Sequence, residues 1–298
     1  MSSPEQLTRS LLAPPTASVT DQVRGEVRDR LLAGVVPRAG QLAPGSPLEV
    51  NLALLRQVRS HPETVTRPDP VFAWKPVFAR RSLGLAVVQA CSDGRFRTPV
   101  DAAETVATEA VEEWRRTGWR TYHWEPWLAG LAPGGRAAVV AEAVTWATAL
   151  WSTFDWREFD PAPRLGGTDD QWLLPADRTV RLKGRAELRV PVRPGGSGSV
   201  GSGSTGSDGP PLPEALVSVT GGAPDDRWAE ELAFLGLVAA LGSPLRPIPA
   251  RVMGVWPDAG ATRMVTIDDD SLMAAADLVI DTVATLVDAR RMPTATAV

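Results

Sequence analysis

A run of alternating apolar and charged residues from Val180 to Val190 constrains the fold more than any other feature of the sequence. Successive side chains of a strand point to opposite faces, so this alternation predicts a strand with one apolar and one charged face. The apolar face holds Val180, Leu182, Ala186, Leu188 and Val190, and the charged face holds Arg181, Lys183, Arg185, Glu187 and Arg189. A second strand is expected over 215–220, before Gly221 and Gly222. Two neighbouring strands that present polar side chains at one point can frame a metal or phosphate site.

Residues 194–213, between these two strands, are rich in Gly and Ser. Such a composition is typical of a flexible coil. The insert could link two domains, but the strands on either side are short and neither is expected to be stable alone. We therefore interpret 194–213 as the flexible tip of a long hairpin.

The composition is that of a globular protein with a substantial core, since 44% of the 298 residues are hydrophobic and 22% are charged. The net charge of −4 means that any contact with nucleic acid needs a local basic patch. A single cysteine, Cys91, excludes an internal disulfide, and two separated histidines, His61 and His123, make a histidine-rich metal site unlikely. We expect a cytoplasmic protein without a membrane segment, because no apolar run is long enough and the start does not read as a secretory signal. The excess of Arg over Lys suggests a GC-rich bacterial genome.

The first 70 residues are expected to form a partly disordered N-terminal extension with loose ends at 1–18 and short helices near 21–34 and 51–58. Further helices are expected from their apolar spacing and capping residues at 79–90, 101–117, 136–154, 226–241 and 271–290. Strands are expected at 249–257 and 264–267, a loop at 157–178, and a disordered tail at 293–298.

From residue 136 onward the expected order is helix, strands, helix, strand, and this order resembles the core of the PD-(D/E)XK nuclease superfamily, in particular its RecB-like branch. Four segments carry the resemblance: Gly184-Arg185-Ala186-Glu187, Leu216 to Gly222, Trp228 to Leu241, and Trp256-Pro257-Asp258-Ala259-Gly260. The resemblance implies an α/β fold with a restriction-endonuclease-like core, a mixed sheet flanked by helices. This domain would span 71–292, include a helical subregion at 71–130, and follow the helical N-terminal extension.

The positions that carry catalysis in that family differ here. The first-strand Asp corresponds to Glu187, the second-strand acidic residue to Ser218, the Lys to Thr220 and the helix Tyr to Leu235. Mg²⁺ prefers charged oxygen ligands, so Glu187, Ser218 and Thr220 read as a vestigial site and no cofactor is expected. Some family members supply a further carboxylate from the preceding helix, where this chain has Glu142. Glu142 with Glu187 is the best remaining metal pair, and Mg²⁺ enters only under that alternative.

The leading hypothesis is a non-catalytic protein with a nuclease fold that binds nucleic acid or a protein partner through Arg181, Lys183, Arg185 and Arg189. The competing interpretation of this cationic face is an exposed sheet surface paired with acidic residues. One alternative function is an active Mg²⁺-dependent DNA nuclease with relocated catalytic residues. Another is a structural or assembly protein whose tryptophans mediate contacts.

Three other motifs have both a functional and a structural interpretation. The Trp-rich segment 114–127 could stack nucleic-acid bases, although such side chains more often fill a core. Gly221-Gly222 could bind a phosphate or form a tight turn that needs positive φ. Asp268-Asp269-Asp270 could bind a cation, but an N-terminal cap of the last helix is the better interpretation.

Overall fold

The computed structural model describes residues 3–15, 19–39, 41, 48–61, 75–120, 123–159, 163, 165, 168–174, 180–192 and 213–291. The helices are α1 (Pro4–Leu12), α2 (Asp21–Ala39), α3 (Leu52–Ser60), α4 (Pro76–Ser92), α5 (Pro99–Thr117), α6 (Glu125–Ala129), α7 (Pro133–Trp151), α8 (Trp228–Gly242) and α9 (Asp269–Arg291). The strands are β1 (Leu48–Val50), β2 (Thr168–Leu173), β3 (Val180–Ala186), β4 (Leu188–Pro191), β5 (Glu214–Val219), β6 (Arg251–Trp256) and β7 (Ala261–Thr266), and two short 3₁₀ turns are η2 (Trp156–Glu158) and η3 (Pro257–Ala259).

The described strands form two small mixed sheets. One has the order β1-β3-β2, with β1 parallel and β2 antiparallel to β3. The other has the order β4-β5-β6-β7, in which β5 and β6 are parallel and are connected through α8. Parallel neighbours need such a crossover, and a helix usually supplies it. The fold is therefore mixed α/β, as the sequence predicted.

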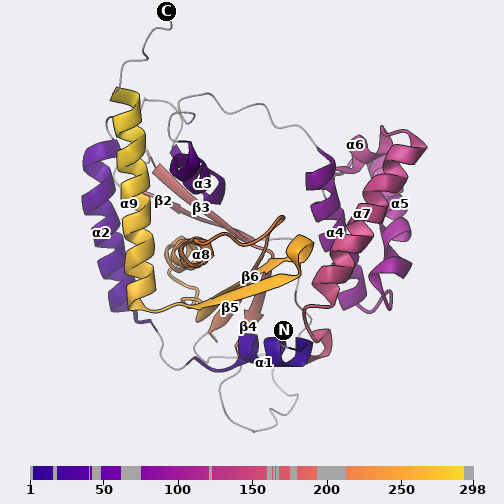
Figure 1. Cartoon of the computed structure of the whole chain (residues 1–298), viewed down its shortest axis with the longest axis horizontal. Helices are drawn as coiled ribbons and strands as arrows, with labels where there is room; N and C mark the ends of the chain where they lie inside the picture. The colour runs from indigo at the N-terminus through magenta and orange to yellow at the C-terminus, as the bar shows by residue number, and fades with distance from the viewer. Residues whose placement is uncertain are drawn as a thin grey trace, which may run out of the picture.

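Helices cover both faces of the four-stranded sheet, and each face has its own core. Ala215, Val217 and Val219 of β5 belong to a core shared with α4, α5 and α7. Leu216, which points the other way, belongs to a core shared with α2, α8 and α9. Figure 1 shows the sheets between these two groups of helices, with α2 beside α9 on one side and α4, α5 and α7 on the other.

The N-terminal region is helical, and its contacts explain two differences from the sequence prediction. Residues 4–12, expected to be loose, form α1, because Ser3 accepts a hydrogen bond from the Gln6 N–H and Leu11 is fully buried. Helix α2 does not end near Gly34 but continues to Ala39. Gly34 instead lies against Ile280 of α9, where a Cβ atom would come within 2.5 Å of the Ile280 side chain.

Two strands were not predicted. β1 lies between the helices expected near 21–34 and 51–58, and it pairs with β3 from Leu48↔Val180 to Val50↔Leu182. β2 lies inside the expected loop 157–178 and pairs along all of its length with β3. The N-terminal region therefore contributes a strand and two packed helices, α2 and α3, to the α8 side of the molecule.

The short helix α6 was also not predicted, and the strand expected over 180–190 is divided into β3 and β4. The other helices and strands agree with the sequence prediction to within a few residues. Helix α5 ends at Gly118, whose φ of 75° is the left-handed conformation expected at a helix C-terminus. The Asp268 carboxylate accepts a hydrogen bond from the Ser271 N–H at 2.8 Å, so this acidic run caps α9. The predictions of a flexible insert at 194–213 and of a disordered tail at 293–298 fall almost entirely outside the described residues.

Candidate functional site

The long predicted strand is interrupted at Glu187. Val180, Leu182 and Ala186, before the break, lie in the α8 core. Leu188 and Val190, after it, lie in the core of α4 and α7. Residues two apart on a regular strand share a face, so this change of core shows that the chain passes from one sheet to the other at Glu187. The expectation that all five apolar residues share one face is therefore wrong.

Glu187 lies between β3 and β4, beside Ser218 of β5. Leu188 pairs with Val217, and the Glu187 N–H donates to the Val217 carbonyl at 2.8 Å. The residues before Glu187 belong to β3, in the other sheet. The Glu187 carboxylate accepts a hydrogen bond from the Val219 N–H of β5 at 2.8 Å.

Two arginines neutralise this carboxylate. The Glu187 side chain is fully buried, and Arg81 of α4 forms an ion pair with it. Arg185 approaches the same carboxylate with its Nε at 3.4 Å. Arg81 and Arg185 remain 37% and 50% exposed, so each guanidinium links the buried carboxylate to solvent.

A pocket of about 340 Å³ opens beside this cluster. Its floor includes Ser218 and Thr220 of β5, and its walls come from β3, from the start of α3 and from Leu235 of α8. The polar residues that line it are Glu49, Asn51, Arg56, Arg81, Lys183, Arg185, Ser218 and Thr220. We call this hollow the splay pocket, because it lies where β3 and β5 separate.

Carboxylates fix several of the cations of the splay pocket. Arg56 donates to both oxygens of Glu231 at 2.7 and 2.6 Å, and this hydrogen-bonded pairing raises the pKa of Arg56. Lys183 lies 3.9 Å from Glu49. Asn51 caps α3 by accepting from the Leu54 N–H and donates to Glu49 at 3.0 Å. Arg56, Arg81, Lys183 and Arg185 outnumber Glu49, Glu187 and Glu231 by one charge, so the pocket suits an anion better than a cation.

The sequence-predicted residues divide into those at the pocket and those elsewhere. Glu187, Ser218, Thr220, Lys183 and Arg185 come together there. Arg189 does not, because it lies opposite Leu216 in the β4–β5 register and thus on the α8 side. It forms ion pairs with Asp170 and with Glu214, and burial lowers its pKa. Arg181, Lys183 and Arg185 alternate with residues of the α8 core, so the prediction of one face with four cations is wrong.

The predicted metal pair is not brought together by any interaction among the described residues. Glu142 is exposed on α7, whereas Glu187 is buried and bound to arginine. Within the described part of the chain, no three His, Cys, Asp or Glu side chains form a group that could hold a metal ion. The two arginines on the carboxylate repel a divalent cation, and Ser218 and Thr220 offer no charge to offset this. The side chains around Glu187 therefore do not fit Mg²⁺.

Sequence reasoning missed Arg81 and Arg56, which reach the pocket from helices outside the resembling segments. Arg80 and Arg81 are the charged residues of the otherwise uncharged helix α4. This adjacent pair was the feature of the sequence that could have indicated a role for Arg81. Arg80 forms an ion pair with Asp258 at 3.2 Å. Asp258 in turn accepts from the Gly222 N–H at 2.9 Å, so the Gly221-Gly222 turn already binds a carboxylate of the chain. Gly222 has a φ of 80°, as the tight-turn interpretation required.

The tryptophans of segment 114–127 serve different purposes. Trp124 is buried in the core of α4, α5 and α7, while Trp119 is 79% exposed just after α5. Base stacking by Trp119 stays a prediction. In the described residues, no helix combines the length and the apolar character needed to cross a membrane.

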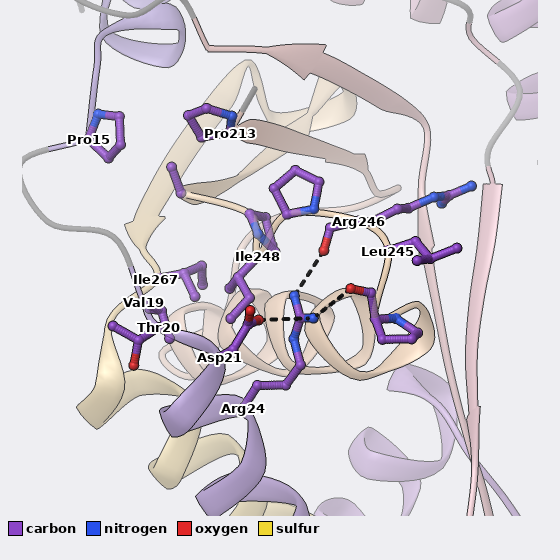
Figure 2. A pocket seen from close by; sticks show the side chains of 14 residues that line it. Pro15, Val19, Thr20, Asp21, Arg24, Pro213, Leu245, Arg246, Ile248 and Ile267 are labelled. Atoms are coloured by element: carbon purple, nitrogen blue, oxygen red, sulfur yellow. Dashed lines mark hydrogen bonds and ion pairs between the residues drawn. The ribbon is translucent and has the colours of Figure 1, made fainter. Parts of the chain in front are cut away.

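A larger hollow of about 600 Å³ lies between the start of α2 and the loop before β6 (Figure 2). Its rim is rich in proline, with Pro15, Pro213, Pro244, Pro247 and Pro249. Arg24 donates to the carbonyls of Pro244 and Arg246 at 3.1 and 2.9 Å and lies 3.2 Å from Asp21. These contacts anchor the loop to α2, so Arg24 serves a structural role in this hollow.

Comparison with known proteins gives no relative on which to base an identification: no family model, no curated protein and no solved structure matches the chain.

Proposed function

We propose that this chain is a non-catalytic relative of RecB-like nucleases that binds a nucleic-acid phosphate in the splay pocket. The observation that carries the proposal is the ion pair between Arg81 and the buried carboxylate of Glu187. In the family resemblance, Glu187 stands where a metal-binding Asp is expected. The Arg81 guanidinium beside Glu187 supplies a positive charge at the position where the family resemblance would place a metal ion.

The order of the elements supports the kinship. Helix α7, strands β2 to β5, the crossover α8 and strand β6 follow in the order on which the resemblance rests. The Gly184-Arg185-Ala186 part of the first resembling segment lies in β3, in a different sheet from Ser218 of β5, and Glu187 connects the two because its N–H bonds to the Val217 carbonyl. The replaced residues Ser218 and Thr220 line the same pocket as Arg185.

The chemistry of the pocket favours a phosphate group. Arg and Lys supply most contacts to nucleic-acid phosphates, and hydroxyl groups such as those of Ser218 and Thr220 add neutral donors. Arg185 is half-exposed beside the pocket, so its guanidinium can reach a ligand while Glu187 fixes its position. The Glu187 carboxylate does not activate water in this arrangement, because it is committed to Arg81 and the Val219 N–H.

Fluorescence anisotropy with a labelled single-stranded oligonucleotide tests the proposal. We expect binding at 50 mM salt that weakens steeply by 200 mM, because phosphate contacts release counterions. Arg185→Ala and Lys183→Ala should each weaken binding and lower the salt slope by roughly 0.7, the value for one single-strand phosphate contact. Arg97→Ala is the matched control, since Arg97 is exposed between α4 and α5, outside both the pocket and the Trp-rich segment. Equal loss in all three variants, or no affinity at 50 mM salt, would overturn the proposal.

A further inference from the structure

We propose that the outer edge of β7 pairs with β7 of a second copy of this chain, antiparallel and centred on Met264. β7 is the last strand in the order β4-β5-β6-β7. Its inner edge pairs with β6 at every residue from Ala261 to Thr266. Met264, at its middle, is 37% exposed. This inference is independent of the phosphate site, which lies at the other end of the order, beside β4 and β5.

The direction of the backbone groups follows from the neighbouring strands. The Val255 carbonyl accepts from the Thr220 N–H at 2.9 Å, so Val255 and its alternates on β6 face β5. The intervening residues of β6 then face β7, where Val252 is opposite Val265 and Gly254 is opposite Arg263. The alternate residues of β7, namely Thr262, Met264 and Thr266, therefore direct their N–H and C=O groups away from the sheet.

Among the described residues, one contact occupies this outer row. The Arg263 guanidinium donates to the Thr262 carbonyl at 2.9 Å, which is an exposed local contact. No other described residue bonds to the outward groups of Thr262, Met264 or Thr266. A hydrogen bond between adjacent residues at the surface is easily exchanged for a cross-strand bond.

β7 lacks most of the features that usually protect an edge strand from pairing. Natural edges carry proline, charged side chains or a bulge, or are very short. β7 has six residues with no Pro, Gly or Lys, its register with β6 is unbroken, and its one charged residue is Arg263. The opposite edge of the same sheet, β4, has four residues and ends at Pro191. The contrast within one sheet singles out β7 as the edge that is open to pairing.

A second copy fits this edge because the row is self-complementary. In an antiparallel pair, outward-directed residues must face outward-directed residues, and a two-fold axis at Met264 achieves this for all of them. Met264 then meets Met264 of the second copy, and Thr262 meets Thr266. Apolar and Thr–Thr cross-strand pairs of this kind are favourable. Centres at Thr262 or Thr266 would leave part of the row unpaired.

Charge also favours this register. Arg263 lies opposite Val265 of the second copy rather than opposite another Arg263, so no like charges face each other directly.

Among the described residues, β7 packs against β6 and, through Val265, against the α8 core. A hollow of about 600 Å³, lined by Thr262, Arg263, Leu7 and Trp256, lies beside the start of the strand. A six-residue edge buries little surface, so we expect a weak dimer with a dissociation constant on the order of micromolar or higher.

Sedimentation velocity across a range of protein concentrations tests the pairing. The wild type should shift from monomer to dimer as concentration rises. Met264→Lys should remain monomeric with an unchanged melting temperature, because it places two lysines face to face at the axis of the pair. Arg263→Ala should dimerise more tightly, since it frees the Thr262 carbonyl. A monomer at all concentrations, or a dimer that persists in Met264→Lys, would overturn the proposal.

Disulfide trapping tests the register separately. In a Cys91→Ala background, Met264→Cys should form a cross-linked dimer under mild oxidation, because directly opposite Cα atoms lie about 5.5 Å apart, within disulfide reach. Thr262→Cys should not cross-link, because Thr262 faces Thr266 of the second copy. Equal cross-linking at both positions, or no cross-linking of Met264→Cys, would contradict this register. If β7 pairs with an unrelated extended segment instead of a second copy, Met264→Cys will not cross-link.

Discussion

Arg81 of α4 forms an ion pair with Glu187, the residue between β3 and β4. The ion pair connects helix α4 to the point where the chain passes from one sheet to the other. The Glu187 carboxylate also accepts the Val219 N–H, which no strand pairs at this position. One buried side chain thus neutralises a cation and completes the hydrogen bonding of β5. We infer that the Arg81–Glu187 ion pair stabilises the fold at the candidate site.

Replacing Glu187 should therefore be costly. Glu187→Ala leaves a cation and a buried N–H without their acceptor, and we expect a loss of about 3 kcal/mol in the free energy of unfolding. Urea denaturation measures this loss. Arg95→Ala, which breaks the pair of Arg95 with Glu109 at 2.7 Å where both side chains are half-exposed, is the control and should cost about 1 kcal/mol or less. Similar losses in the two variants would show that the Glu187 pair is not a structural anchor.

Two glycines of the same helix should respond in opposite ways to alanine. Gly34→Ala in α2 drives a Cβ atom into Ile280 of α9, and overpacking of this kind costs roughly 1–3 kcal/mol. Gly25→Ala has open space around the new Cβ atom and should stabilise the helix by roughly 0.5–1 kcal/mol. Thermal unfolding of the two variants and of the wild type shows whether each substitution raises or lowers the stability. A stabilising Gly34→Ala would mean that α2 and α9 do not pack closely at this point.

Cys91 should be a poorly reactive thiol. It is buried on α4, and this burial raises the pKa of the thiol to about 11, well above its ordinary value of 9.0. At pH 8 the native protein should react slowly with a thiol reagent, and the urea-unfolded chain should react fast. Rapid labelling of the native protein at pH 8 would contradict the burial.

The same shift predicts a loss of stability in alkali. The pKa of the Cys91 thiol is higher in the folded than in the unfolded protein, so the unfolded thiol ionises first as pH rises. The contribution of this thiol to the free energy of unfolding is therefore fully present below pH 9 and is lost as pH rises toward 11. Denaturation midpoints between pH 8 and 11 should fall more steeply for the wild type than for Cys91→Ala. Parallel curves for the two proteins would show that the thiol does not contribute.

The helices were largely predictable from sequence, and two of the strands were not, for physical reasons. The spacing of apolar residues and the capping residues located α4, α5, α7, α8 and α9, because these signals are local. β2, with the sequence Thr-Asp-Asp-Gln-Trp-Leu, carries no alternation that marks a strand. Its Asp170 is buried because Arg189 pairs with it, and such a contact has no local signature.

The candidate site was predictable in part. Alternation and the family resemblance brought Lys183, Arg185, Glu187, Ser218 and Thr220 to one place, and they line or adjoin the splay pocket. Alternation could not show that the chain passes to the other sheet at Glu187, because the residue pattern continues unchanged through the break. Nor could alternation reveal Arg81, which comes from a helix 106 positions earlier in the chain. This long-range pairing makes Glu187 an arginine-bound carboxylate.

The most direct measurement of the central claim is oligonucleotide binding and cleavage by the wild-type protein, followed in parallel with EDTA and with Mg²⁺. We predict binding in EDTA that Mg²⁺ does not strengthen and an intact oligonucleotide after prolonged incubation, because Arg81 and Arg185 supply the positive charge at Glu187. Cleavage that requires Mg²⁺ and disappears in Glu187→Gln would contradict the account and would favour the Mg²⁺-dependent nuclease.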